Sequence, residues 1–177
     1  MNTKKMITDS MFCLLKIKSL DKITIDMILN ECQVSRSTFY RYFNDKYELM
    51  NWCYKSYVDT LLIRVYNGNE SWKSTLSLIY QFLNDNHEYF EQASKVQGNN
   101  SFEDFLYSYS YDFYETVYLR ETKEKSLGVE ARVALEFNCI GGVHIVKQWL
   151  KNGRKESIVN MAEWTYQLLP EMFRKFL

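Results

Sequence analysis

A short stretch of the chain, QVSRSTFYRYFNDKYEL (residues 33–49), concentrates side chains that suit contact with nucleic acid. Arginine can donate two parallel hydrogen bonds to guanine, and serine or threonine hydroxyls can bond either a base edge or a phosphate. Lysine and tyrosine can hold phosphate oxygens, and a helix N-terminus adds free N–H groups there. The residues of these types are Ser35, Arg36, Ser37, Thr38, Tyr40, Arg41, Tyr42 and Lys46. Their concentration predicts a DNA-binding element.

Two short helices must position these side chains. Thr24 is a suitable N-cap for a helix from Ile25 to about Cys32, and Ser35 can cap a second one that ends near Phe43. Two short helices joined by a three-residue turn are typical of a helix-turn-helix motif. Phe39 and Phe43 are four residues apart and share one face, which we expect to pack on the first helix. The opposite face then presents the cations and hydroxyls.

Residues 7–49 resemble the DNA-binding domain of the TetR family of bacterial transcriptional regulators. The run ITIDMILNECQVSRSTFYRYFNDKYEL, residues 23–49, resembles the family's Thr-led second helix, its V-S-x-x-T-[FL]-Y-x-[HY]-F recognition helix and the lysine that opens a long connecting helix. The chain departs from the family at Gln33, where a glycine is usual, so Gln33 must adopt a left-handed conformation or change the turn. The resemblance implies phosphate contacts by Thr24, Ser37, Tyr40, Tyr42 and Lys46, and base contacts by Arg36, Thr38 and Arg41.

The whole chain reads as helical. It has 177 residues with a single proline and six glycines, and apolar residues recur at spacings of three and four. We therefore predict an all-α fold. Residues 1–48 would form a three-helix DNA-binding domain, and the resemblance implies that residues 49–177 form a helical domain for effector binding and dimerisation.

Several functional classes are disfavoured by composition. Lys plus Arg and Asp plus Glu each number 22, so the net charge gives no sign of nucleic acid by itself. The four cysteines are too scattered for a metal or redox site, and no stretch approaches the roughly 18 apolar residues of a membrane span. No catalytic motif or phosphate loop occurs. We expect a cytoplasmic protein that is not an enzyme and has no metal, cofactor or membrane partner.

The second domain is rich in aromatic residues, especially between Phe102 and Tyr118. They either form an ordinary core or line a cavity for an unknown small-molecule effector. His144 lies on an apolar helix, where it either packs or contacts such a ligand. The candidate ligand-binding residues are Tyr89, Phe90, Phe105, Tyr109, Phe113 and His144.

Two late helices, near residues 129–150 and 158–169, are candidates for self-association. The pair Gly141-Gly142 lies within the first, and glycine inside a helix usually marks the close approach of another group. The resemblance implies that these helices pair with those of a second copy, so that two recognition helices meet a palindromic operator. The candidate interface residues are Ile140, Val143, Val146, Lys147, Trp149, Leu150, Met161, Trp164, Thr165 and Leu168.

The sequence thus predicts a DNA-binding transcriptional regulator. The resemblance implies a homodimeric repressor that a small-molecule effector releases from double-stranded DNA. An activator of the same family is the first alternative, and a helical protein-binding adaptor is the second. Salt separates the adaptor from the regulator, because affinity for DNA falls log-linearly with salt when several phosphates are held.

Overall fold

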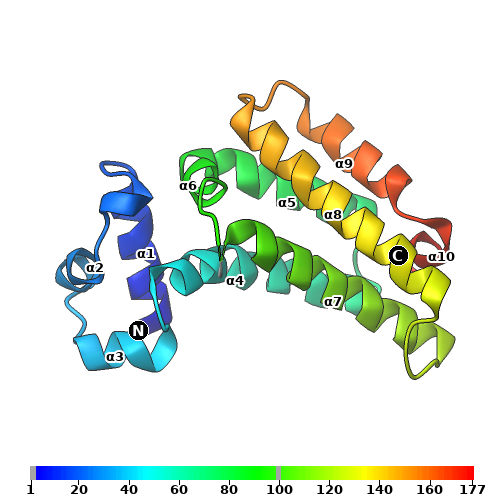
Figure 1. The fold of residues 1–177 in the computed structure, drawn as a ribbon, viewed down its shortest axis with the longest axis horizontal. Coiled ribbons are helices and arrows are strands. Elements are labelled where there is room, and N and C mark those ends of the chain that lie inside the picture. The colour runs from blue at the N-terminus through cyan, green and yellow to red at the C-terminus, as the bar shows by residue number, and fades with distance from the viewer. Residues whose placement is uncertain (1–2, 99–100) are drawn as a thin grey trace.

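The computed structural model describes residues 3–98 and 101–177 (Figure 1). These ranges contain ten α-helices, one short 3-10 helix and the loops that connect them. Residues 1–2 of the predicted first domain lie outside the described part. The predicted all-α fold is confirmed. No helix in the described ranges is both long and apolar enough to cross a membrane.

The small N-terminal unit lies at one end of the molecule in Figure 1 and holds the motif predicted from the sequence. Thr24 accepts a hydrogen bond from the Met27 N–H, and Ser35 accepts one from the Thr38 N–H, so both predicted caps are present. Its elements are α1 (Thr3–Leu15), the 3-10 helix η1 (Leu20–Lys22), α2 (Ile25–Cys32) and α3 (Arg36–Tyr42).

Gln33 ends α2 in the left-handed conformation, with φ of 54° and ψ of 36°. An L-residue with a side chain loses about 1–2 kcal/mol in this region relative to the right-handed one. The Gln33 amide nitrogen donates to the Asn30 carbonyl at 2.6 Å, which fixes the side chain beside the turn. The turn therefore keeps the geometry that glycine usually provides.

The remaining helices form the larger unit, and α4 connects it to the N-terminal unit (Figure 1). Asp45 caps α4 by accepting from the N–H groups of Tyr47 and Glu48. The most extensive packing joins α5 with α9 and α7 with α8. The helices are α4 (Lys46–Tyr66), α5 (Trp72–Asp85), α6 (His87–Ala93), α7 (Phe102–Thr122), α8 (Val129–Lys151), α9 (Ile158–Leu168) and α10 (Glu171–Arg174).

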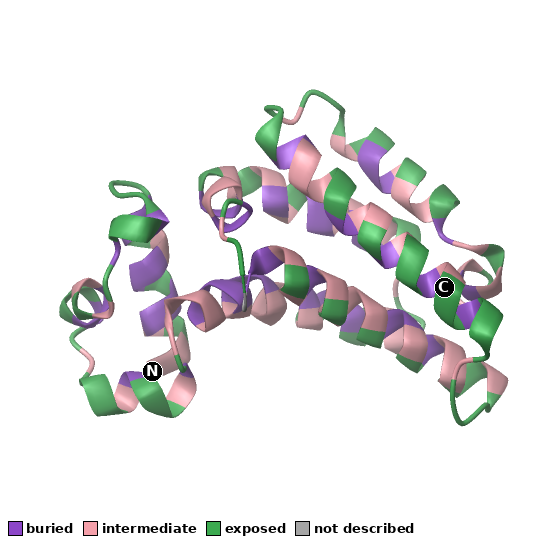
Figure 2. Ribbon diagram, viewed as in Figure 1, coloured by how far each residue is buried: buried purple, intermediate pink, exposed green. Residues whose placement is uncertain are grey.

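One continuous core runs through both units, and the buried side of each helix faces it (Figure 2). Phe39 and Phe43 are fully buried, as their spacing predicted, and they anchor α3 from behind. Burying an aromatic side chain of this size contributes on the order of 2–3 kcal/mol. This anchoring leaves only the outer face of α3 for a partner.

Candidate functional site

The outer face of α3 carries exposed polar side chains directly opposite its buried phenylalanines. Ser37, Tyr40 and Arg41 are exposed there. The Ser35 hydroxyl lies 3.1 Å from the Ser37 hydroxyl and 2.9 Å from that of Thr38, so three hydroxyls cluster at the start of the helix. Such a cluster can donate to phosphate oxygens or to base edges in a major groove.

The two arginines of α3 differ in their surroundings. Arg36 forms an ion pair with Asp26 of α2, and this hydrogen bond raises the pKa of the guanidinium. Arg41 has no ion pair with any residue that the structure describes, and its side chain is exposed. Arg41 is therefore the cation on α3 that is ready to meet a phosphate or a guanine, whereas Arg36 must first leave Asp26.

Lys46 does not project towards a DNA surface. Its ammonium group donates to the carbonyl oxygens of Leu20 at 2.8 Å, Ile23 at 2.8 Å and Asp21 at 3.3 Å. Burial lowers the pKa of this ammonium, and its three protons are all directed at the chain itself. In this structure the Lys46 side chain ties the start of α4 to η1, whereas the sequence suggested a phosphate contact for it.

We expect the Lys46→Met variant to lose about 1–3 kcal/mol of unfolding free energy, because three carbonyl oxygens lose a charged donor. Urea unfolding followed by circular dichroism measures the loss. Lys16→Met is the control, since Lys16 is an exposed lysine close to the same turn. Equal stability of both variants and the wild type would return Lys46 to the phosphate-binding set.

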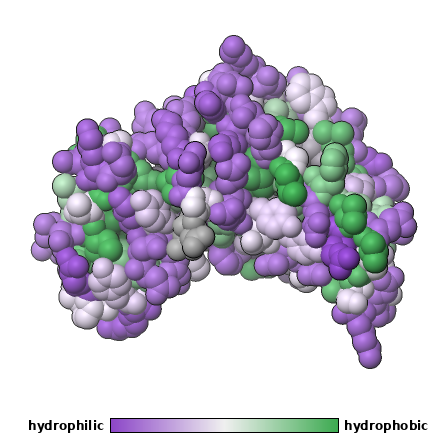
Figure 3. All heavy atoms as spheres, viewed as in Figure 1, coloured by the Kyte–Doolittle hydropathy of each residue, from purple (hydrophilic) through white to green (hydrophobic). Residues whose placement is uncertain are grey.

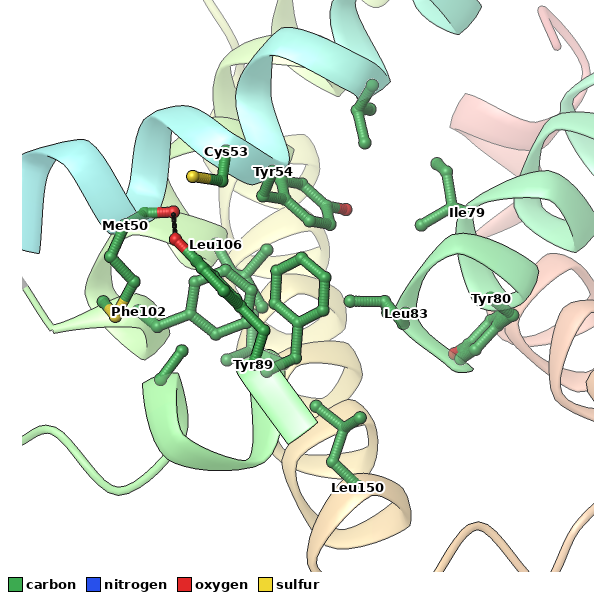
Figure 4. Packing of buried hydrophobic residues seen from close by; sticks show 14 of the residues in the cluster. Met50, Cys53, Tyr54, Ile79, Tyr80, Leu83, Tyr89, Phe102, Leu106 and Leu150 are labelled. Carbon is green, nitrogen blue, oxygen red and sulfur yellow. Dashed lines mark hydrogen bonds between the residues drawn. The ribbon is translucent and has the colours of Figure 1, made fainter. Parts of the chain in front are cut away.

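Helix α6 holds the same turn from the other side. The Gln92 side-chain oxygen accepts from the Leu20 N–H, so η1 is fixed by α4 and by α6 at once. Tyr89 of α6 donates its hydroxyl to the Met50 carbonyl of α4 at 2.9 Å (Figure 4), and its ring lies 4.5 Å from that of Phe12 in α1. A shift of α6 relative to α4 would therefore displace η1 and α1 of the DNA-binding unit.

A cavity of about 400 Å³ lies between α5, α7, α8 and α9. Its wall is mainly apolar and aromatic. The lining residues are Tyr54, Trp72, Leu76, Ile79, Tyr80, Leu83, Leu106, Ser110, Tyr114, Phe137, Asn138, Cys139, Gly141, Gly142, Val143, Ile145, Val146, Thr165, Leu168 and Pro170. Its size and lining are those of a small-molecule site.

None of the six residues proposed from the sequence for effector binding lines this cavity. Four of them pack around α4 and α6 instead. Phe90, Phe105 and Tyr109 lie edge-on to the ring of Tyr54 in α4, and Tyr89 of α6 bonds to Met50 of α4. Tyr109 donates its hydroxyl to Asp59 of α4, and Phe113 stacks near Trp72. His144 is exposed on α8. The six residues are Tyr89, Phe90, Phe105, Tyr109, Phe113 and His144.

The structure also divides the residues proposed for self-association. Val143, Trp149, Leu150 and Met161 are buried inside their own chain, which leaves little of their surface for a second copy. Their burial follows from the packing of α8 on α7 and of α9 on α5. The other six split further. Lys147 pairs with Glu103, Thr165 bonds to Tyr80 and Val146 lines the cavity, whereas Ile140, Trp164 and Leu168 are exposed.

The exposed apolar residues continue beyond those three. Phe137 leaves 83% of its surface in solvent and Ile140 leaves 61%. The set that we call the α8–α9 face is Val129, Val133, Phe137, Ile140, Ile145, Val159, Trp164 and Leu168. Hydrophobic residues are visible over α8 and α9 in Figure 3. Spacings of four along α8, from Val129 to Val133 to Phe137, were the sequence signal for the missed members.

A helix-turn-helix with outward cations and hydroxyls, joined to a helical unit with a cavity, defines a DNA-binding regulator. Residues 14–52 match the family model of bacterial regulatory proteins of the tetR family, and residues 70–171 match the model of a transcriptional regulator C-terminal region. The chain belongs to the TetR family of bacterial transcriptional regulators, whose members bind DNA and small-molecule effectors.

One curated protein and three solved structures are similar to this chain. The dhaKLM operon transcriptional activator DhaS of Lactococcus lactis subsp. lactis (strain IL1403) is 26% identical over 107 residues, which span 59% of this chain and 54% of DhaS. A solved structure of DhaS, the dihydroxyacetone kinase operon activator, covers 98% of this chain and 97% of its own, with 19% identity and a TM-score of 0.66.

FadR from Bacillus subtilis, solved with stearoyl-CoA, covers 95% of this chain and 98% of its own, with 16% identity and a TM-score of 0.61. A TetR-family regulator from Syntrophomonas wolfei covers 97% and 92%, with 18% identity and a TM-score of 0.60. At these identities the structural likenesses show a shared fold.

Proposed function

We propose that this regulator acts in the cytoplasm as a homodimer that binds a palindromic operator without catalysing a reaction. The observation that carries the proposal is the outer face of α3, where Arg41 and the hydroxyl cluster face solvent over a buried Phe39 anchor. A two-fold axis presents two such faces to half-sites one helical turn or a multiple of it apart. DNA contacts are assigned to Thr24, Ser35, Arg36, Ser37, Thr38, Tyr40, Arg41 and Tyr42.

A second copy is the proposed occupant of the α8–α9 face. The N-terminal half of α8, residues 129–140, has a net charge of −1 from Glu130, Glu136 and Arg132. The C-terminal half, residues 141–151, has +2 from Lys147, which is paired with Glu103 of α7, and from the exposed Lys151. Antiparallel crossing of two α8 helices at Gly141-Gly142 brings opposite net charges together. Nothing in the described chain lies within 4 Å of a Cβ placed at either glycine, which leaves room for a second backbone.

The cavity is the proposed effector site. Helix α5 contributes Leu76, Ile79 and Leu83 to its wall and is followed by α6 after a single residue, Asn86. Because Gln92 of α6 holds η1, a ligand that moves α5 biases the position of the DNA-binding unit. The FadR structure contains stearoyl-CoA, which supports small-molecule control in this fold.

The direction of control has two candidates. Release of a repressor by its effector is the first, as the family resemblance implied. Activation is the second, because the relative that matches over 107 residues is named a transcriptional activator. A reporter fused to the bound promoter separates them: deletion of the regulator raises expression for a repressor and lowers it for an activator.

Selection from a random DNA pool tests the proposed function without a known operator. We expect the purified protein to enrich sequences that contain an inverted repeat. Fluorescence anisotropy on the enriched DNA should then show affinity that falls log-linearly with salt, since several phosphates release counterions. Enrichment of single half-sites would contradict the dimer, and no enrichment over the starting pool would contradict specific DNA binding.

A further inference from the structure

We propose that the cavity binds a neutral, mainly apolar small molecule with one or two hydrogen-bonding atoms, and that the second copy of the chain closes the cavity's mouth. The effector and the dimer contact would then share residues. This inference rests on the proposed homodimer and adds the chemical class of the ligand and the route by which it enters.

The cavity wall carries no formal charge. No Asp, Glu, Lys, Arg or His is present among the described residues that line it. A charged ligand would lose its hydration there without gaining an ionic partner, which costs several kcal/mol per charge. Carboxylates, phosphates and ammonium groups are therefore poor fits, and a neutral molecule is favoured.

Polar groups of the wall include the buried side chains of Tyr54, Trp72, Tyr80 and Tyr114 and the half-buried ones of Ser110, Asn138 and Thr165. The Trp72 indole N–H makes no hydrogen bond of good geometry among the described residues, but it lies close enough to the Tyr114 hydroxyl to act on the pKa of that group, which it lowers. Burial raises the pKa of Tyr54 and of Tyr114, so both remain protonated donors. Figure 4 shows the Tyr54 hydroxyl directed towards the α5 side of the core, near Ile79.

These groups define how a ligand would be oriented. A buried donor without a hydrogen bond costs about 1–3 kcal/mol. A ligand oxygen atom that accepts from the Trp72 indole N–H would therefore add about that much to the binding free energy. The hydroxyl of Tyr80 is already bonded to Thr165 at 2.7 Å and closes the opposite wall between α5 and α9. A carbonyl or hydroxyl at one end of an otherwise apolar molecule matches the arrangement.

The mouth of the cavity lies on the α8–α9 face. Phe137, Ile145 and Leu168 line the cavity and are also exposed, and Gly141 and Gly142 form part of the rim. Crossing of two α8 helices midway between the glycines places residue 137 of one copy opposite residue 146 of the other. At that height along α8 the exposed rim residue is Ile145, so Phe137 of the partner subunit lies over Ile145 and shields the bound molecule from water.

A matched pair of fluorescent probes tests the ligand class. N-phenyl-1-naphthylamine is neutral, and 8-anilino-1-naphthalenesulfonate is a closely related molecule that carries a sulfonate. We expect the neutral probe to bind the full-length protein with one site per chain, and at least about tenfold more tightly than the anionic probe. Equal affinities, or tighter binding of the sulfonate, would overturn the neutral class.

Cavity-filling variants locate the probe. Ser110→Phe adds a ring inside the cavity, whereas Ser108→Phe adds the same ring to an exposed position of α7 that does not line it. We expect about a tenfold loss of neutral-probe affinity for the first variant only. Ile145→Trp at the exposed rim gives a second test if Ser110→Phe fails to fold by circular dichroism. Unchanged binding in a folded cavity-filling variant would overturn the site.

The closing role of the second copy is tested with Ile140→Asp, which lies on the α8–α9 face but does not line the cavity. Sedimentation reports whether the variant is monomeric. We expect the monomer to bind the neutral probe about tenfold more weakly than the dimer. A monomer that binds equally well would overturn closure by the partner. A monomeric wild type would overturn the proposed homodimer. Specific DNA binding is tested independently by the selection from a random DNA pool.

Discussion

Replacing Arg41 with alanine is expected to lower affinity for the selected operator about tenfold to a hundredfold. A single arginine contact to guanine or to a phosphate contributes about 1–3 kcal/mol. Arg41 is exposed on α3 and has no ion pair within residues 3–98 and 101–177, so none of this energy is spent in breaking an internal contact. Fluorescence anisotropy at fixed salt measures the loss.

Two comparisons sharpen this experiment. Arg36→Ala should cost less, because the Arg36 side chain is paired with Asp26 and must leave that carboxylate before it meets DNA. Lys125→Ala removes a cation from the exposed loop after α7 and should leave affinity unchanged. Wild-type affinity in Arg41→Ala, with a loss in Arg36→Ala, would assign DNA recognition to the arginine near the start of α3 instead.

The helix-turn-helix was predictable because its determinants are local. Capping by Thr24 and Ser35 and the pairing of Phe39 with Phe43 depend on residues at most four positions apart. Lys46 shows where this reasoning ends. Its partners are backbone carbonyls 23 to 26 residues earlier in the chain, and a carbonyl carries no sequence signature. Only the fold reveals that its charge is directed inward.

An effector site was predicted from the sequence, but none of the six residues named for it lines the cavity between α5, α7, α8 and α9. Aromatic content indicates that rings are buried, yet it does not indicate which interface they fill. The hydroxyls of Tyr89 and Tyr109, which had been assigned to a ligand, instead donate hydrogen bonds to α4. The cavity arises where α5, α7, α8 and α9 fail to meet completely, and such a gap depends on helix positions that periodicity does not specify.

The α8–α9 face shows a third feature that the sequence pattern does not specify, namely which apolar side of a helix faces solvent. Sequence spacing indicated two helices that do carry exposed apolar residues, but one helix has both a core face and an outer face, each with apolar residues. Val143 and Ile140 are three positions apart, and the first is buried while the second is exposed. Their separation required knowledge of which side of α8 contacts α7. The glycine pair lines the cavity, and no described residue lies within 4 Å of a Cβ placed at either glycine.

The Ile140→Asp variant is expected to be a monomer and to lose about a hundredfold or more in operator affinity. Two copies of an aspartate near the crossing point would bury unpaired charge at the contact. A monomer holds one half-site only and loses the effective concentration that links the second recognition helix to the first, which is worth about 10²- to 10⁴-fold. Sedimentation and fluorescence anisotropy measure the two effects on the same sample.

Ile63→Asp is a closely matched control. Ile63 leaves 59% of its surface exposed against 61% for Ile140, and both are isoleucines in long helices, but Ile63 lies on α4 outside the α8–α9 face. The control should remain dimeric and bind the operator as the wild type does. If Ile140→Asp stays dimeric, another surface holds the two copies together. If it is monomeric yet binds with full affinity, the operator is read by one recognition helix, and symmetry has no role in it.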